Sequence, residues 1–412
     1  MPGVSTTGQD ADRTLAQALE VIQVGIVLDE NQIAWGNCAS ASDDHIPNHP
    51  SPFRANEGVA TIETTIAPAL IGQPLTGFRR LTTLLETLRE TVTISKVIPL
   101  PDEPSTGISR RDIITGFLAS KEPSSPKVMT EETRIVRRLH PAILFGVSQA
   151  LLTAVAMDRQ LTMAEVIAEE FELARPMKAI DLQIPIVRGQ TLHLSDQITS
   201  LGYKIGGSDP QKTLGPDCER LQRFVRQLRE RITAADEHRE ITLHLDVTGG
   251  LGQIYEGDTG KILGALHGLE QAGSPGLLRV QDPLITGDLD AQITEMKQLR
   301  NYLNMRRMSL RLVAGAHIYT VDDVRAFAQA RAVHMISLVM PRFGTIQEVI
   351  MAIQACQANE IGVLLEGTPL IVAVQIALSA SPDILVCPPD SAAIAAINNE
   401  MARTLAWLAH KG

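Results

Sequence analysis

The distribution of apolar and polar positions divides the chain into two regions. From about residue 181 onward, short apolar runs alternate with longer segments whose apolar positions follow a helical period. The candidate strands are DLQIPIV (181–187), SLGYKIG (200–206) and the segments LHLDV, LLRVQDP, RLVAGA, ISLVM, VLLEG and ILVCPP. Eight such strands, separated by helices with charged outer faces, predict a closed (β/α)8 barrel. The alternative, an open doubly wound sheet, would need a Gly-rich phosphate loop after an early strand, and the sequence has none.

The first part of the chain predicts a smaller α+β domain. The segments IQVGIVLDE and QIAWGNCAS indicate a hairpin, and TIETTIAPALIG indicates a helix that ends at Gly72. A Pro- and Ser-rich stretch at 92–130 is typical of an exposed insertion.

The segment 134–158 follows this insertion, and its pattern predicts a helical region interrupted at Pro141. Thr162 and Glu165 form a capping box for the next helix. We therefore expect an N-terminal extension at 1–20, an α+β domain at 21–160 that contains the 92–130 insertion, and a barrel domain at 161–412.

Composition narrows the classes of function. The formal net charge is −10 and no basic stripe is present, which argues against a nucleic-acid partner. The apolar runs fall short of the roughly 20 residues needed to cross a bilayer, and the N-terminus lacks the pattern of a secretion signal. The four cysteines are widely spaced without a C-x-x-C pair, which favours reduced thiols in the cytoplasm. We expect a cytoplasmic protein with no membrane contact.

Several segments together carry a family resemblance. They are HPAILFGVSQALLTAVAMDRQLTMAEVIAEEF, VGIVLDENQIAWGNCAS, IETTIAPALIGQPLTGFRRL, LHLDVTGGLG, LLRVQDP, VDDVRAF and HMISLVMPRFG. In this order the chain resembles the methylaspartate ammonia-lyases of the enolase superfamily, over roughly residues 20–410. The resemblance implies an enolase-like modified (β/α)8 barrel with an N-terminal α+β capping domain, and a homodimer. It also implies proton abstraction next to a carboxylate, with Mg²⁺ held by three acidic side chains.

Most positions of the family's metal and base site are changed in this sequence. The first metal carboxylate corresponds to Asp246, but the second corresponds to Gln281 and the third to Gly315. The family's basic Lys corresponds to Val339. Mg²⁺ binds proteins through carboxylates, so we expect no metal and no cofactor here, although the family would imply Mg²⁺.

The substrate-contacting positions of the family are also only partly kept. The candidate substrate-binding residues of this chain are Gln190, Gln211, Gln281, Ser337 and Thr368, with Pro369 where the family has a Cys. We expect the small-molecule partner to be an amino acid or another carboxylic acid.

Five ionisable residues stand near the expected strand ends and are candidates for a rebuilt catalytic site: Lys204, Asp246, Asp282, His317 and Glu366. Each has a structural alternative. Asp282 before Pro283 is typical of a turn cap, and His317 is equally consistent with a solvated loop. The apolar run before Glu366 does not fix which way its side chain points, and Asp246 can serve as a structural hydrogen-bonding group.

Two further residues near the strand ends have both structural and functional interpretations. His244 alternates with Asp246 and therefore shares its face of the strand. Cys387 stands where a nucleophile could act, but a buried structural thiol is the commoner case.

Two functions are compatible with the sequence. One is a lyase or isomerase that binds a small amino or carboxylic acid at the strand ends and works by altered chemistry without Mg²⁺. The other is a catalytically silent homologue that acts as a binding or assembly partner. Whether the chain is an enzyme is left open by the sequence, because fold alone does not decide function.

Overall fold

The computed structural model describes residues 20–28, 32–39, 53–99, 128–174, 178–186, 197–205, 209–236 and 238–410, without the side chains of 93–99 and 128–133. Two compact units are present: 1–86 together with 140–412, and Thr87–Leu139.

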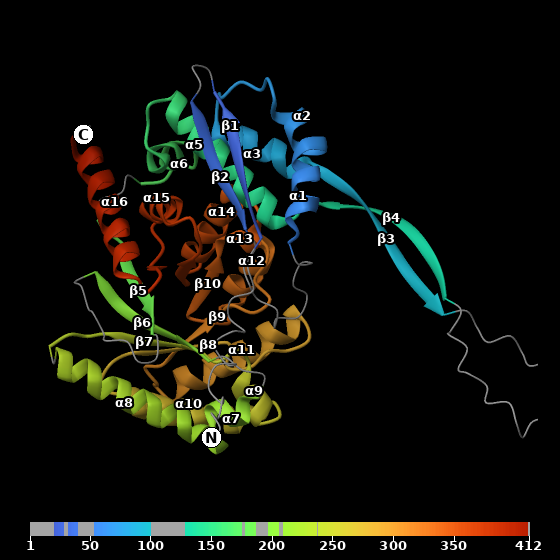
Figure 1. Ribbon diagram of the computed structural model, residues 1–412. Coiled ribbons are helices and arrows are strands. Elements are labelled where there is room, and N and C mark those ends of the chain that lie inside the picture. The colour runs from blue at the N-terminus through green and yellow to red at the C-terminus, as the bar shows by residue number, and fades with distance from the viewer. Residues whose placement is uncertain are drawn as a thin grey trace, which may run out of the picture. The chain divides into compact units, whose positions relative to one another are not determined.

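Eight parallel strands close into a barrel, which confirms the predicted fold class (Figure 1). The strands are β5 (Asp181–Pro185), β6 (Ile198–Lys204), β7 (Thr242–Asp246), β8 (Leu278–Gln281), β9 (Arg311–Ala314), β10 (Met335–Val339), β11 (Gly362–Glu366) and β12 (Ile384–Val386). Each strand pairs with its neighbours in sequence order, and β12 closes the ring on β5. We call the carboxyl ends of these strands the barrel mouth, where enzymes of this architecture place their active sites.

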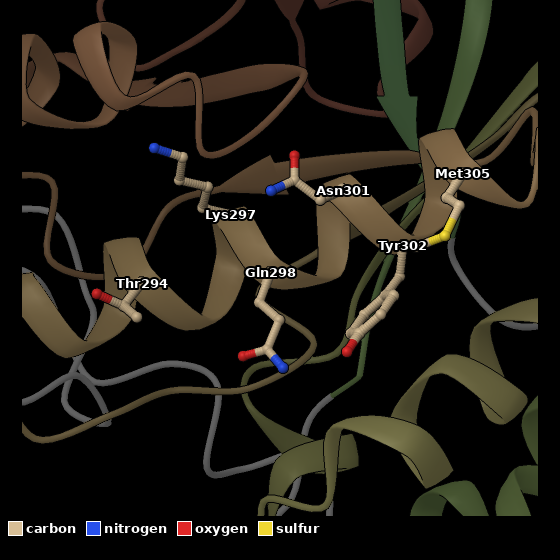
Figure 2. A pocket seen from close by; sticks show the side chains of 6 residues that line it. All are labelled: Thr294, Lys297, Gln298, Asn301, Tyr302 and Met305. Atoms are coloured by element: carbon tan, nitrogen blue, oxygen red, sulfur yellow. The ribbon is translucent and has the colours of Figure 1, made fainter.

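Helices follow the strands and cover the barrel (Figure 1). They are α7 (Pro210–Leu214), the 3₁₀ turn η4 (Pro216–Cys218), α8 (Glu219–Ala235), α9 (Gly250–Ile254), α10 (Thr259–Gly273), α11 (Leu289–Met305), α12 (Val321–Ala330), α13 (Met340–Phe343), α14 (Ile346–Gln357), α15 (Leu370–Ala380) and α16 (Ser391–His410). Side-chain caps define their starts: Asp288, Thr320 and Thr345 accept from backbone N–H groups of the first turns of α11, α12 and α14. One side of α11 borders a shallow surface hollow (Figure 2).

The interior of the barrel is apolar on one side and polar on the other. Strands β9 to β12 contribute the apolar cluster Val313, Met335, Leu364 and Ile384. Strands β5 to β8 contribute the polar residues Gln183, Ser200, His244 and Arg279, of which Gln183 pairs with Ser200 and His244 pairs with Arg279. Ser200 Oγ donates to Gln183 Oε1 at 2.8 Å, and Arg279 Nη1 donates to Ser200 Oγ at 3.4 Å. Barrel interiors are usually filled by branched apolar residues. The polar side therefore needs internal hydrogen bonds to be stable.

The N-terminal residues form the predicted hairpin with its helices. The elements are β1 (Val21–Val27), β2 (Ile33–Ala39), α1 (Ala55–Thr61), the π-helical turn η3 (Ile62–Ile66), α2 (Ala67–Leu70), α3 (Phe78–Thr87), α5 (Pro141–Asp158) and α6 (Met163–Glu170). Gly72 ends the predicted helical stretch with a φ of +78°, which glycine adopts without strain. The hairpin packs directly on α5, because a β-carbon on Gly36 would overlap Gly146 and one on Gly146 would overlap Cys38.

Helix α5 is long and apolar enough to cross a membrane by length and composition, and 78% of it is buried inside the protein. Its apolar side chains are therefore used to pack the core.

A separate antiparallel hairpin accounts for part of the predicted insertion. Strand β3 (Arg89–Pro99) pairs with β4 (Val128–Arg138), while residues 100–127 lie outside the described residues. The predicted helical start at 134 is wrong, because Arg134–Arg138 pair with β3 and the helix begins only at Pro141. Proline is favoured in the first helical turn, where its missing N–H costs no hydrogen bond. The predicted domain boundaries themselves stay a prediction.

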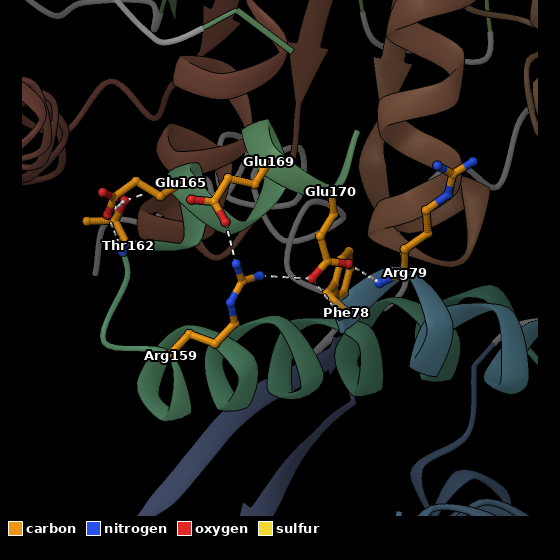
Figure 3. Close-up of polar contacts among 7 residues, drawn as sticks. All are labelled: Phe78, Arg79, Arg159, Thr162, Glu165, Glu169 and Glu170. Carbon is orange, nitrogen blue, oxygen red and sulfur yellow. Dashed lines mark hydrogen bonds and ion pairs between the residues drawn. The ribbon is translucent and has the colours of Figure 1, made fainter. Parts of the chain in front are cut away.

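Hydrogen bonds join the N-terminal helices to one another (Figure 3), and others join these helices to the barrel domain. The predicted capping box of Thr162 and Glu165 is present, and Trp407 Nε1 of α16 donates to Glu165 Oε2 at 3.2 Å. Glu170 accepts from the backbone N–H groups of Phe78 and Arg79 at 2.9 and 2.7 Å. Near the barrel mouth, the backbone N–H of Ile346 donates to Ser148 Oγ of α5 at 3.0 Å. The N-terminal domain is thus anchored beside the strand ends.

Candidate active site

Three candidate residues form a row on adjacent strands at the barrel mouth. Lys204 pairs in register with Asp246, and Asp246 pairs with Gln281. Lys204 Nζ lies 3.7 Å from Asp246 Oδ2, and the Lys204 side chain is well exposed. Asp246 Oδ1 accepts from the backbone N–H and the hydroxyl of Thr248 at 3.0 and 3.1 Å. Asp246 is therefore both an ion-pair partner and a structural acceptor.

Glu366 points into the barrel mouth. It is in register with Val339 and lies two residues beyond Leu364, which belongs to the inner apolar cluster. This register settles the direction that the sequence left open. The Glu366 side chain is exposed to solvent. Nevertheless its pKa is raised, first by desolvation and also by the charge of Asp246, while Lys204 and Arg342 oppose the increase. An accessible carboxylate that the protein still desolvates fits a position in a concave mouth.

Asp282 is buried beside this row and binds backbone amides. Its carboxylate oxygens accept from the N–H groups of Gly315 and Ala316, each at 3.0 Å. Burial and the neighbouring Asp246 raise its pKa from 3.8 to about 7, although the hydrogen bonds oppose this increase. The structural alternative for Asp282, a turn cap, therefore describes its contacts. Its pKa near neutrality is also that of a proton-transfer group.

Gln281 fills the space between these acidic groups. The Gln281 side chain opposes the increase in the pKa of Asp282, as expected for a nearby amide that favours the ionised carboxylate. His244 is buried, and its Nδ1 has no hydrogen-bond partner among the described residues. Burial, followed by the charge of Arg279, lowers the pKa of His244 to about 3, so the imidazole is neutral at ordinary pH.

The residues present do not fit the three-carboxylate Mg²⁺ site that the resemblance implies. Of the three positions only Asp246 is acidic, and a β-carbon added at Gly315 would lie 2.5 Å from Gln281 Nε2. Among the residues that the structure describes, no group of three His, Cys, Asp or Glu side chains is placed to hold a metal ion. We derive no catalytic step through a metal.

The structure adds Arg342, which the sequence analysis missed, to the barrel mouth. This residue lies in α13, directly after β10, and its side chain is buried. Its Nη1 donates to the carbonyl of Gly315 at 3.2 Å, and its guanidinium lies 5.9 Å from the centre of the Tyr319 ring. Burial lowers its pKa to about 10, and Glu366 opposes this effect. The sequence did contain a signal for this residue, an Arg within the apolar segment SLVMPRFG. Because a buried Arg is rare without a partner, an Arg there indicates a specific contact.

The remaining candidates lie in different surroundings. His317 is buried, with Nε2 at 2.9 Å from the carbonyl oxygen of Thr286, so it is not a solvated loop residue. Ser337 is buried on the inner register of β10. Gln211 in α7 and Thr368 after β11 are exposed, and Gln190 lies outside the described residues. The catalytic and binding roles assigned to these residues stay predictions.

Cys387 has the properties of a structural thiol. It is buried, its Sγ lies 3.5 Å from the carbonyl oxygen of Gln183, and burial raises its pKa to about 12. Thiolate nucleophiles need the opposite shift.

Two surface hollows lie away from the barrel mouth. The one on α11 is lined by six residues of that helix alone (Figure 2). The other lies between α5, α6, α15 and α16, and it contains the exposed side chains of Met157, Ile371 and Trp407. Neither hollow contains a candidate residue, whereas the charged candidates converge at the barrel mouth.

The closed barrel, its N-terminal α+β domain and the placement of the candidate residues at the strand ends define an enolase-like protein. Family models described as methylaspartate ammonia-lyase N-terminus and C-terminus match residues 5–98 with 114–172, and 207–410. The chain therefore belongs to the methylaspartate ammonia-lyase family.

Individual relatives agree with this assignment. Methylaspartate ammonia-lyase 2 of Carboxydothermus hydrogenoformans is 28% identical, over 97% of this chain and 89% of its own length. The methylaspartate ammonia-lyase of Clostridium tetanomorphum is 28% identical, over 85% of this chain and 75% of its own length. The solved structure of β-methylaspartase from Clostridium tetanomorphum, an Mg complex, has a TM-score of 0.72 at 25% identity, over 95% of this chain and 88% of that one. Muconate lactonizing enzyme from Pseudomonas putida shares the fold alone, with a TM-score of 0.56 at 14% identity, over 87% of this chain and 78% of that one.

Proposed function

We propose that this chain binds a small amino or carboxylic acid at the barrel mouth and converts it by a lyase or isomerase reaction that does not use Mg²⁺. The observation that carries the proposal is the convergence of charged groups there. Lys204 and Asp246 form an ion pair, and Glu366 interacts electrostatically with both and with Arg342. Two cations and two anions around one opening match the carboxylate and ammonium groups of an amino acid.

The arrangement supports distinct roles for these residues. The exposed Lys204 and the buried Arg342 are suited to bind a ligand carboxylate, since a guanidinium can hold a carboxylate through two parallel hydrogen bonds. Asp246 is suited to bind an ammonium group. Glu366 is the candidate general base, because desolvation raises its pKa and a carboxylate becomes a stronger base as its pKa rises.

Calorimetry in the presence of EDTA tests binding. The (2S,3S)-3-methylaspartic acid that is bound in the Citrobacter amalonaticus enzyme structure is the first probe, followed by methylsuccinate, which lacks its amino group. We expect the wild-type protein to bind at least one of these acids. We expect Lys204→Met and Glu366→Gln each to change the dissociation constant by about tenfold, equivalent to about 1.4 kcal/mol. Lys297→Met is the matched control, because Lys297 lines the hollow on α11. Absence of binding by these and other small dicarboxylic acids would refute the proposal.

An ammonia-release assay tests the chemistry. We expect no Mg²⁺-dependent release of ammonia from 3-methylaspartate, since the second and third metal ligands and the Lys base are replaced by Gln281, Gly315 and Val339. Any turnover should be the same with Mg²⁺ and with EDTA. Turnover that requires Mg²⁺ would show that the family's chemistry is retained.

The second candidate function is a catalytically silent binding or assembly partner. It is favoured by the contacts of Asp282 and His317, which use their polar atoms on backbone groups. Binding of an acid with no turnover across a substrate panel would support it. We also propose a homodimer, and analytical ultracentrifugation of the full chain would detect a monomer if this is incorrect.

A further inference from the structure

Arg342 lies on a short corner that joins the barrel to its next long helix. This segment, which we call the α13–α14 corner, runs from Met340 to Gln347 and contains α13, Gly344 and the start of α14. Gly344 turns the chain with a φ of +109°, which residues other than glycine rarely adopt. Arg342 precedes Thr345, the N-cap of α14, by three residues, so the position of its backbone depends on how that end of the corner is held.

Helix α3 of the N-terminal domain holds the corner through Glu86. Thr345 Oγ1 donates to Glu86 Oε1 at 2.6 Å, and Gln347 Nε2 donates to Glu86 Oε2 at 3.2 Å. Thr82, one turn earlier in α3, donates to Gln347 Oε1 at 2.9 Å. Thr82, Thr345 and Gln347 are buried, so a group that lost its partner there could not turn to water instead. The start of α14 is therefore fixed to α3 by hydrogen bonds between side chains.

Helix α5 holds the same corner through Ser148. The backbone N–H of Ile346 donates to Ser148 Oγ at 3.0 Å, and Ser148 Oγ donates to the carbonyl of Phe145 at 2.8 Å. A hydroxyl can accept one hydrogen bond while it donates another, so both contacts of Ser148 form together. Ser148 is fully buried, and α13 packs against α5. Two helices of the N-terminal domain thus hold the corner that carries Arg342.

The contacts of the Arg342 side chain lie on a different part of the barrel from its backbone. The carbonyl of Gly315 and the ring of Tyr319 both belong to the segment that follows β9, whereas the Arg342 backbone belongs to the corner after β10. The hydrogen bond from Nη1 to Gly315 measures 3.2 Å, at the long end of the usual range for N–H donors. A small shift of the corner would therefore break it.

We propose that Glu86 and Ser148 are positioning residues that hold the α13–α14 corner and thereby set where the Arg342 guanidinium stands at the barrel mouth. The N-terminal domain then contributes to the affinity of the mouth for a carboxylate by acting through Arg342. The part that concerns affinity rests on the proposed function, whereas the placement of Arg342 does not.

A double-mutant cycle on acid binding tests this role. Calorimetry with (2S,3S)-3-methylaspartic acid is done on Glu86→Ala, alone and combined with Arg342→Met or with Lys204→Met. We expect Glu86→Ala to raise Kd about tenfold in wild type and in Lys204→Met, but less than about twofold in Arg342→Met, because its effect passes through the guanidinium. The same tenfold increase in Arg342→Met would overturn the inference.

Glu170→Ala is the matched control, because it disturbs the opposite end of α3. Glu170 accepts from the backbone N–H groups of the first two residues of this helix, whereas Glu86 lies near its last residue (Figure 3). We expect Kd to change less than about twofold. An increase equal to that of Glu86→Ala would show that loosening of the N-terminal domain in general weakens binding. Glu86→Gln, which keeps an acceptor for the Thr345 hydroxyl, should retain most of the wild-type affinity.

A second measurement does not depend on ligand binding. Selective ¹⁵N labelling of arginine allows hydrogen exchange of the buried Arg342 Nε–H to be followed by NMR, with assignment by loss of the signal in Arg342→Lys. We expect at least about tenfold faster exchange in Glu86→Ala and in Ser148→Ala than in wild type, and an unchanged rate in Glu170→Ala. Equal exchange rates in wild type, Glu86→Ala and Ser148→Ala would overturn the inference.

The two proposals fail separately. If no acid binds to wild type but the exchange pattern is as expected, the proposed function is wrong and the positioning of Arg342 stands. If acids bind and the exchange of Arg342 is the same in wild type and in both variants, the positioning is wrong and binding of an acid stands.

Discussion

Asp282→Asn tests the electrostatics of the barrel mouth through the pH dependence of stability. Asp282 is 3% exposed, and its pKa is raised from 3.8 to about 7 by burial and by Asp246. A carboxyl group whose pKa is raised on folding contributes stability that is fully present below its unfolded pKa and is lost as pH rises through its folded pKa. The difference between the two values corresponds to about 4 kcal/mol over the whole range, at about 1.4 kcal/mol per pH unit.

The expected signal lies between pH 5 and pH 8. Over this interval the wild-type free energy of unfolding should fall by about 2.5 kcal/mol relative to Asp282→Asn, because asparagine does not titrate. Any constant cost of placing an amide against the N–H groups of Gly315 and Ala316 cancels in this comparison. Urea unfolding at both pH values, with the same measurement on Asp246→Asn, is the assay. The Asp246→Asn background should show a smaller fall, since it removes a like charge.

A difference between wild type and Asp282→Asn that stays constant from pH 5 to pH 8 would refute this reasoning. It would mean that the two backbone N–H groups stabilise the ionised carboxylate enough to offset its burial. Asp282 would then be a permanently charged turn cap and not a proton-transfer group.

Three further predictions concern the fold. His334 accepts a hydrogen bond from the backbone N–H of Leu312 at 3.0 Å. Burial, followed by the charges of Arg300 and Arg311, lowers the pKa of His334 to about 4. The contribution of His334 to the free energy of unfolding should therefore be present above pH 6.5 and lost as pH falls toward 4. Urea unfolding should show this loss, about 1 to 3 kcal/mol, in wild type relative to His334→Asn, and parallel pH profiles would contradict it. Gly146→Ala should lower the free energy of unfolding by about 3 kcal/mol or more in thermal unfolding, because the added β-carbon would overlap the backbone of Cys38. Gly264→Ala is the control, because a β-carbon there would have no atom within 4 Å. All four cysteines are buried, and burial raises the pKa of each thiol to about 12. Native protein should therefore react with a thiol reagent far more slowly than urea-unfolded protein. Rapid labelling of native protein would show that the thiols are not packed in the core.

Much of the fold could be predicted from local pattern because the elements are regular. The strand ladder, the N-terminal hairpin and the capping box at Thr162 are visible as alternation, helical period and paired capping residues. Strand β4 was missed because its end, Arg134–Arg138, was assigned to the following helical region, whereas the strand is held by pairing with β3 far earlier in the chain. Local sequence carries no record of such a partner.

The candidate site was predictable in position but not in contacts. The sequence placed Asp246, Gln281 and Gly315 at strand ends, and the register confirms the row of Lys204, Asp246 and Gln281. The direction of the Glu366 side chain could be assigned only from the pairing of Glu366 with Val339, because the apolar run before it shows no alternation of apolar and polar residues. Arg342 was missed because its partner, the carbonyl of Gly315, lies on a different strand end.

Charge balance explains why a barrel mouth without a metal can remain folded. Asp246, Asp282 and Glu366 surround one opening, and three carboxylates at close range destabilise one another unless cations or hydrogen-bond donors compensate. Here Lys204 pairs with Asp246, Arg342 and Lys204 both favour the ionised form of Glu366, and backbone amides with Gln281 support Asp282. Each carboxylate thus has a protein partner where a divalent ion would otherwise be needed. Removing Lys204 or Arg342 alone should therefore leave an uncompensated negative charge at the barrel mouth.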